Sequence, residues 1–361
     1  MSVKKIVSFI VSAAIVLFGF FCVLSGISSG EHPVSLLDIP AWSSRLVQNR
    51  LSQNEDLTKI APSLLLAFGP KERDGIFITD DYLLENISSP NEEILKQNIE
   101  GIKKFAEKRN AHTAVVLIPT ACAIKQRELP PSVRLFNQKE LINQCYNQFS
   151  GLASTVDAYS QLFAAENQYT YYRTESLPTG LGGYYIYTAL ASRLGMNPRS
   201  LDQFEMQNLP HDYYGSLYER TNYKGVAPDL LTLYRFSRYS RQYKLSITEN
   251  GEQKSYYTLF PTHLGELGDP KSIIFGGFGE RTDISVASPY EDSILIFADE
   301  TALSYLPFLV VHHGNITIID LANCTPEQLK DINVENYTRV LFSYSVDNFI
   351  HKDVCSAAAK M

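Results

Sequence analysis

The chain has 361 residues, of which 45% are hydrophobic and 20% charged, and its formal net charge is −7. This length accommodates one or two globular domains. The negative balance and the lack of a Lys/Arg block exclude nucleic acid as the main partner. The four cysteines beyond the N-terminal region are widely spaced and form no CxxC, so they predict neither a zinc site nor a disulfide framework.

The N-terminus carries a long uncharged run. Lys4 and Lys5 precede residues 6–27, which are apolar apart from Ser and Gly. About 20 such residues span a bilayer, and basic residues before the run favour an N-inside orientation. We therefore expect a cytoplasmic tip (1–5), a transmembrane signal-anchor and an extracytoplasmic remainder. The alternative is a cleaved signal peptide and a secreted protein, because small residues end the run in VLSGISSG.

Residues 28–70 read as a juxtamembrane arm, and a globular pattern follows. A short apolar strand is predicted at 75–79. The apolar residues of 91–110 share one helical face, and 113–120 is a continuous apolar run typical of a strand covered on both faces.

The middle of the chain predicts a helix at 138–149 and strands at 154–159 and 169–173. A polar turn at 174–179 leads into a helix over 180–194, with Gly195 as its C′ residue. Residues 200–270 have weak periodicity, and we interpret them as an insertion over the carboxyl edge of the sheet.

The last third alternates strands and helices: strand 293–299, helix 301–312, strand 316–321, helix 325–332 and strand 339–344. This alternation predicts an α/β fold with a doubly wound, mostly parallel sheet. Such sheets bind ligands beyond the carboxyl ends of their strands. Those ends carry polar residues here, but no GxSxG, Walker, HExxH or strand-linked GxGxxG motif is present.

Six segments occur in a fixed order: GIFITDDYLLEN (75–86), AVVLIPTACAI (114–124), YTYYRTESLPTGLGGYYIY (169–187), HDYYGSLYER (211–220), SIIFGGFGE (272–280) and ADETALSYLPFLV (298–310). Together they resemble the bacterial DHHW family, which is similar to SGNH-type hydrolases and to alginate O-acetyltransferase accessory proteins. The resemblance implies one SGNH-hydrolase-like domain over 71–355.

In the family, the turn corresponding to 174–179 carries an Asp-His-His-Trp-Thr run. By resemblance, Glu175 stands at the Asp, Ser176 and Leu177 stand at the two His, and Pro178 stands at the Trp, while Thr179 is retained.

A second family run, Lys-Asp-Ser, corresponds to the end of the strand at 293–299. Asp299 is retained, but Glu300 stands at the nucleophilic Ser, and Phe278 stands where the family has Asn. Acyl transfer by a serine needs a hydroxyl, a base within hydrogen-bond reach and a group that orients the base. The resemblance therefore implies a degenerate site in which no intact catalytic residue is expected.

Three alternatives remain for these positions. Ser304 or Thr301, or Ser176 itself, could supply a hydroxyl, with a histidine from elsewhere: His211, His263, His312, His313 or His351. Glu300 could instead cap the following helix. Finally, Glu175, Asp299 and Glu300 could converge into an acidic pocket for a divalent cation or an amine, or for acid–base chemistry.

The resemblance implies an accessory or binding subunit in envelope polysaccharide O-acylation. Its expected partners are a membrane-bound O-acyltransferase and an envelope polysaccharide, and no cofactor or metal is expected. An active O-acetyltransferase or esterase with relocated catalytic residues is one alternative. An envelope carbohydrate-binding module is another.

Overall fold

The computed structural model describes residues 72–109, 112–129, 133–237, 242–266, 270–287 and 292–361. The predicted signal-anchor (6–27) and juxtamembrane arm (28–70) lie outside these residues. Within the described ranges, no helix combines the length and the apolar character that crossing a membrane requires.

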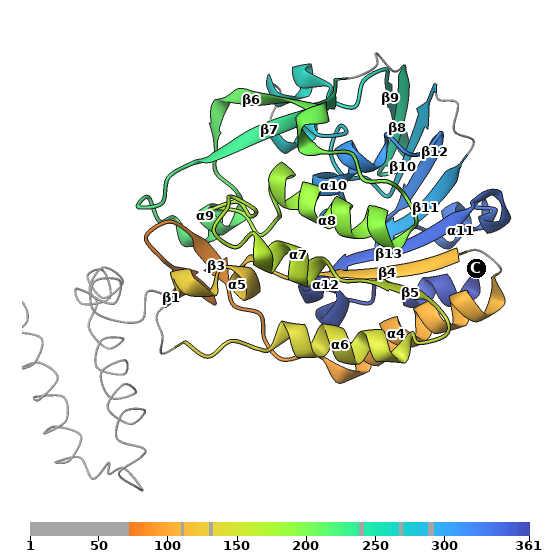
Figure 1. The fold of residues 1–361 in the computed structure, drawn as a ribbon, viewed down its shortest axis with the longest axis horizontal. Coiled ribbons are helices and arrows are strands. Elements are labelled where there is room, and N and C mark those ends of the chain that lie inside the picture. Colours follow the sequence, from red (N-terminus) through yellow and green to blue (C-terminus); the bar gives the residue numbers. More distant parts are fainter. Residues whose placement is uncertain (1–71, 110–111, 130–132, 238–241, 267–269, 288–291) are drawn as a thin grey trace, which may run out of the picture. The chain divides into compact units, whose positions relative to one another are not determined.

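An eight-stranded sheet forms the core, in the order β5-β4-β13-β11-β12-β10-β8-β9 (Figure 1). Its first five strands run parallel, and β10, β8 and β9 continue it antiparallel. The strands are β4 (His112–Ile118), β5 (Ser154–Val156), β8 (Tyr243–Glu249), β9 (Glu252–Tyr256), β10 (Arg281–Val286), β11 (Ser293–Ala298), β12 (Asn315–Ile319) and β13 (Arg339–Ser345). The predicted mostly parallel α/β sheet is thus present, with an antiparallel extension.

Continuous apolar runs explain the centre of this sheet. Six of the seven β4 residues and five of the six β11 residues are buried, because helices cover both faces. In Figure 1, α4 and α12 lie on one face, and α8 and α10 lie on the other. The helices are α4 (Glu92–Lys108), α5 (Ala121–Ile124), α6 (Gln138–Gln148), α7 (Ala158–Ala164), α8 (Gly180–Arg193), α9 (Ser216–Thr221), α10 (Ala302–Leu309), α11 (Pro326–Lys330) and α12 (Val346–His351).

The helices predicted over 91–110 and 180–194 are confirmed as α4 and α8. Gly195 follows α8 with φ +72°, the left-handed conformation expected of a C′ glycine. Gly183 lets α8 approach α10 closely, because a Cβ there would lie 1.9 Å from the carbonyl oxygen of Ser304. This contact places the turn before α8 beside the start of α10.

The predicted strand at 169–173 is wrong. These residues belong to a loop with an isolated bridge between Tyr171 and Pro178. The loop closes on itself, since Thr179 N donates to Thr170 O (3.0 Å). The carboxylate of Asp229 accepts from the amides of Arg173 (2.6 Å) and Thr174 (2.8 Å), and the carbonyl of Arg173 accepts from the Leu83 amide (2.7 Å). Because Asp229 and Leu83 supply partners for this backbone, the loop does not join the main sheet.

The segment 200–270 has two parts. β6 (Phe204–Tyr213) and β7 (Asp229–Phe236) pair with each other, and α9 lies between them in the sequence. β8 and β9 instead extend the main sheet. Before the core lie β1 (Glu72–Arg73) and the pair β2 (Ile76–Ile78) and β3 (Leu83–Glu85). α5, α9 and β3 lie at the edge of the main sheet where its parallel strands end (Figure 1).

Candidate functional site

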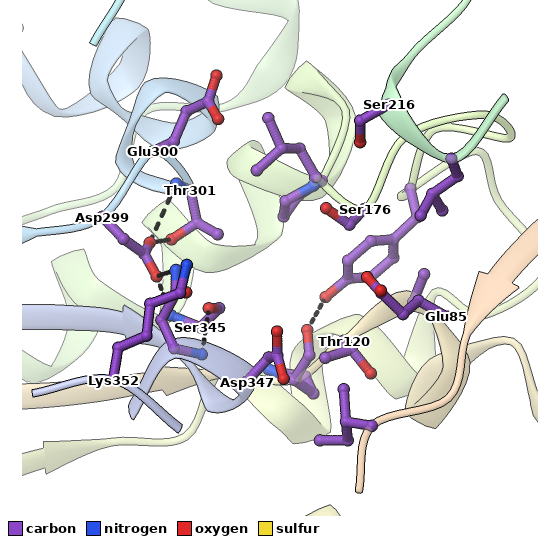
Figure 2. Close-up of a pocket in the computed structure, with 18 of the residues that line it drawn as sticks. Glu85, Thr120, Ser176, Ser216, Asp299, Glu300, Thr301, Ser345, Asp347 and Lys352 are labelled. Atoms are coloured by element: carbon purple, nitrogen blue, oxygen red, sulfur yellow. Dashed lines mark hydrogen bonds between the residues drawn. The ribbon is translucent and has the colours of Figure 1, made fainter. Parts of the chain in front are cut away.

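A cleft of about 390 Å³ opens at the carboxyl ends of the parallel strands. Figure 2 shows polar side chains facing it from several elements. Segment 299–301 follows β11, segment 345–352 follows β13 and includes α12, and segment 176–178 precedes α8. The rest of the wall comes from β3, from the residues after β4 and from α9, through side chains that include Glu85, Thr120, Ser216, Leu217 and Arg220.

Glu175 is buried directly behind this wall, with 3% of its surface exposed. Its carboxylate accepts hydrogen bonds from the Ser216 hydroxyl (2.6 Å) and amide (3.1 Å), from the Ser176 amide (2.8 Å) and from the Tyr213 hydroxyl (3.0 Å). Burial alone would raise the pKa of Glu175. The bonds from Ser216, the charge of Lys271 and the Ser176 amide outweigh burial and hold the pKa below its ordinary value of 4.5.

This depressed pKa predicts a pH dependence of stability. Because the folded pKa of Glu175 lies below the unfolded value, the ionised carboxylate stabilises the fold above about pH 4.5, and this stabilisation is lost as pH falls through the folded pKa. Urea unfolding at a series of pH values should show a steeper acid loss for the native chain than for Glu175→Gln. Glu252→Gln, at an exposed position on β9, is the matched control. Identical pH dependence in Glu175→Gln and the native chain would contradict this assignment.

Lys271 connects Glu175 to Glu300. Its Nζ lies 3.5 Å from Glu175 Oε2 and 3.1 Å from Glu300 Oε1. The three side chains form a row of carboxylate, ammonium and carboxylate. Leu177 lines both the cleft and a smaller adjoining cavity, which Lys271 and Glu300 also line. The Ser176 hydroxyl bonds Glu175 Oε1 at 3.3 Å.

Asp299 ties three elements together at the opposite wall. It accepts from the Thr301 amide (3.1 Å) and hydroxyl, from the Ser345 amide (2.8 Å) and from the Asn348 side chain (2.8 Å). The sequence offers Glu300 as a cap of α10, but the amide of Thr301, the N-cap residue of that helix, bonds Asp299 instead. Through these four hydrogen bonds, Asp299 connects the end of β11 to the start of α10 and to α12.

The candidate hydroxyls have acceptors but no imidazole beside them. The Ser304 hydroxyl donates to Thr301 O (2.7 Å), and the Thr301 hydroxyl donates to Asp299. Ser304 lines the smaller cavity. Phe278 lies further away, on a hollow of about 730 Å³ that Glu300 and Lys271 also line. The structure therefore gathers Ser176, Leu177, Asp299, Glu300 and Thr301 on the cleft itself, with Glu175 behind it and Ser304 and Phe278 beside it.

No histidine lines the cleft among the described residues. His312 Nε2 lies 2.7 Å from the Tyr187 hydroxyl. His313 is buried, and burial lowers its pKa to about 4. His351 contacts Asp347 and Ser88. His211 is exposed on β6, and His263 lies in the 3₁₀ segment Thr262–Glu266.

The carboxylates do not form a cation site. Glu175 and Glu300 share the Lys271 ammonium, and Asp299 is occupied by amide and hydroxyl donors. Across the described ranges, no group of three or more His, Cys, Asp or Glu side chains is arranged to hold a metal ion.

Sequence reasoning missed Lys271, Ser216 and Tyr213, the three side chains that surround Glu175. Ser216 and Tyr213 lie in the segment 211–220 noted for its resemblance, but nothing in that segment predicts a contact with a turn about 40 residues earlier. No local sequence pattern indicates a role for Lys271, because its ion pair with Glu175 joins positions 96 residues apart.

Comparisons with known proteins agree with this fold. The family model described as "DHHW protein" matches residues 79–319. The fold is similar to that of a DHHW family protein from Eubacterium siraeum, with a TM-score of 0.65 and 20% identity over 80% of this chain and 96% of the other. It is also similar to Bacillus cereus PatB1 with a sulfonyl adduct, with a TM-score of 0.63 and 16% identity over 77% of this chain and 96% of that one.

A lower similarity, with a TM-score of 0.46 and 13% identity, relates 76% of the chain to 92% of the O-acetyltransferase domain of Pseudomonas putida AlgJ. No curated protein matches the sequence. At these identities the matches to the Eubacterium siraeum protein and to PatB1 establish the fold, and the family model establishes the family.

Proposed function

We propose a function from one premise: this chain belongs to the DHHW family. Within that family it acts as an accessory subunit in cell-envelope polysaccharide O-acylation. It is tethered to the membrane through residues 6–27, and its cleft binds part of the polysaccharide beside a membrane-bound O-acyltransferase. The cleft does not itself transfer acyl groups by a Ser-His-Asp mechanism.

The observation that carries this proposal is the row Glu175, Lys271 and Glu300. At the positions that the resemblance gives to an orienting acid, a base and a nucleophile, the cleft presents a buried carboxylate, the aliphatic Leu177 and a carboxylate paired with an ammonium. The aliphatic Leu177 cannot accept a proton, and Glu300 offers no hydroxyl for nucleophilic attack. In a serine hydrolase, removal of the catalytic serine, histidine and aspartate lowers turnover roughly a millionfold.

The lining of the cleft favours a hydroxyl-rich ligand. Its volume of about 390 Å³ lies within the range of small-ligand sites, about 300–1,000 Å³. Its lining carries four carboxylates (Glu85, Asp299, Glu300 and Asp347) and two cations (Arg220 and Lys352), so it is net negative even though Arg220 pairs with Glu85. The side chains of Thr120, Ser176 and Ser216 line this space (Figure 2). A net negative lining with many donors and acceptors matches a sugar better than an apolar or anionic molecule.

Binding is tested with the full-length chain and an array of oligosaccharides with and without O-acetyl groups. We expect binding to at least one class, weakened about tenfold, or about 1.4 kcal/mol, by Arg220→Ala or Glu300→Ala. Glu252→Ala, exposed on β9, is the matched control and should bind as the native chain does. Binding to no oligosaccharide, or equal binding by all variants, would contradict the proposal.

The absence of catalysis in the cleft has its own test. With an activated acetyl ester as substrate, Ser176→Ala and Ser304→Ala should leave the rate of turnover unchanged. A loss of turnover in either variant would assign chemistry to the cleft and overturn this part of the proposal. Co-purification from membranes tests the association with an O-acyltransferase.

A further inference from the structure

Ser88, His351 and Asp347 form a connected row of side chains away from the family positions. The Ser88 hydroxyl lies 2.9 Å from Nε2 of His351, and Nδ1 of the same ring lies 2.8 Å from Oδ1 of Asp347. Ser88 belongs to the loop between β3 and α4, whereas the other two lie one turn apart on α12. A hydroxyl, an imidazole and a carboxylate in this order meet the distance requirement of a nucleophile, a general base and an orienting acid.

We propose that Ser88, His351 and Asp347 form a nucleophilic site that cleaves esters at the margin of the cleft. The site is distinct from the family positions at 175–177 and 299–300. It goes beyond the binding role proposed for the cleft, because either function can exist without the other. The substrate class is an acyl ester of an alcohol, such as an O-acetyl group on a sugar.

The backbone around this row is fixed. Ile87, the neighbour of Ser88, is 7% exposed and lines the cleft, and the amide of Asn91 donates to Ile350 O at 3.1 Å. The loop is thus anchored on both sides of Ser88. Asp347 also lines the cleft (Figure 2), so a ligand bound there would lie beside the row.

The ring nitrogens have different partners, and this assigns their roles. A carboxylate accepts only, so Nδ1 carries a proton that it donates to Asp347, which leaves the Nε2 lone pair to accept the Ser88 proton. Nε2 also lies 3.2 Å from the carbonyl oxygen of Ser89. Once the ring has taken the hydroxyl proton, that carbonyl can accept from the new N–H and stabilise the imidazolium.

The proposed chemistry balances with water as the only co-reactant. Ser88 Oγ attacks the ester carbonyl carbon while its proton passes to His351 Nε2, and a C–O bond forms. The tetrahedral intermediate expels the alcohol, which takes the proton from the imidazolium, and the acyl group remains on Ser88. Water then attacks the acyl carbon by the same proton transfers, which releases the carboxylic acid and restores the hydroxyl.

Backbone donors are available for the oxyanion. Within the described part of the chain, the amides of Ser88 and Ser89 donate to no protein acceptor. The amide of a nucleophile and that of its neighbour are frequent contributors to oxyanion stabilisation. Ser88 is exposed at the surface, so a bulky substrate can reach it.

The experiment treats the full-length chain with a fluorophosphonate and locates the adduct by peptide mass spectrometry, alongside hydrolysis of 4-nitrophenyl acetate. We expect an adduct on Ser88 that His351→Gln abolishes. Ser88→Ala and His351→Gln should each lower the rate of ester hydrolysis by about 100-fold or more, and Asp347→Asn should also lower it. Ser160→Ala, at an exposed serine on α7 far from this row in the sequence, should keep both the adduct and the rate.

The adduct separates catalysis from a structural role, in which His351 would only hold the loop against α12. In that case the variants would change the melting temperature, but no adduct would form on Ser88 of the native chain. An unlabelled Ser88, in a sample where an added serine hydrolase is labelled, would overturn the proposal. Oligosaccharide binding is measured on the same samples, so failure of this proposal and failure of the binding role give different results.

Discussion

Replacing Asp229 with alanine should lower the free energy of unfolding by about 2–5 kcal/mol. Asp229 is 2% exposed, and its carboxylate accepts from the Arg173 amide, the Thr174 amide and hydroxyl, and the Tyr169 hydroxyl. The hydroxyls can rotate toward other partners, but the two amides cannot. Each buried donor left unpaired costs its full desolvation penalty, which is why the expected loss is large.

Urea unfolding of Asp229→Ala measures this loss. Asp212→Ala is the matched control, because Asp212 is an exposed aspartate on β6, and exposed substitutions usually change stability by less than about 0.5 kcal/mol. Asp229→Asn keeps the volume and one acceptor, so its loss should be intermediate. If Asp229→Ala were as stable as Asp212→Ala, the loop at 169–179 would not depend on this carboxylate.

Asp229 also links stability to the cleft. It holds the loop whose continuation carries Ser176 and Leu177 on the cleft wall. Any oligosaccharide affinity should therefore fall in Asp229→Ala even though Asp229 does not line the cleft. A stable variant with unchanged affinity would separate the two roles.

Hydrophobic patterns predicted the elements that are buried by contact with the sheet. The run at 113–120 became β4, and the one-sided pattern at 91–110 became α4, because burial on one or both faces decides these segments. The strand predicted at 169–173 failed for a different reason. Tyr171 and Tyr172 are buried, but Asp229 from β7 binds the backbone at the end of the segment, and a contact between residues about 55 apart leaves no local pattern.

The candidate site, like the fold, was predictable from the sequence only in part. Resemblance placed the turn at 174–179 and the end of β11 at one cleft, and the structure brings them together. The cation between them could not be predicted, because Lys271 is one lysine among 32 Lys and Arg residues, and only the fold brings it to Glu175. Asp347 and His351 have the i, i+4 spacing of a helical pair, but their serine lies 263 residues before the histidine.

Replacing Asn98 with alanine should destabilise the fold by about 3–5 kcal/mol, because up to four buried backbone groups lose their partner. Asn98 is 0% exposed on α4. Its Nδ2 donates to the carbonyls of Phe349 (2.8 Å) and Lys352 (2.7 Å), and its Oδ1 accepts from the amides of Val354 and Cys355 (both 2.9 Å). One side chain thus satisfies every donor and acceptor that it possesses, and it fixes the end of α12 to α4.

Two further variants separate the causes of this loss. Asn98→Leu keeps the volume but pairs none of the four backbone groups, so it should lose at least as much stability as the alanine variant. Gln97→Ala, at the exposed neighbour on the same helix, should stay within about 0.5 kcal/mol of the native chain. A native-like Asn98→Leu would mean that packing, rather than hydrogen bonding, secures the C-terminal segment. Because Asn98 binds the residues on either side of His351, its loss should also reduce labelling of Ser88 at temperatures where the variant remains folded.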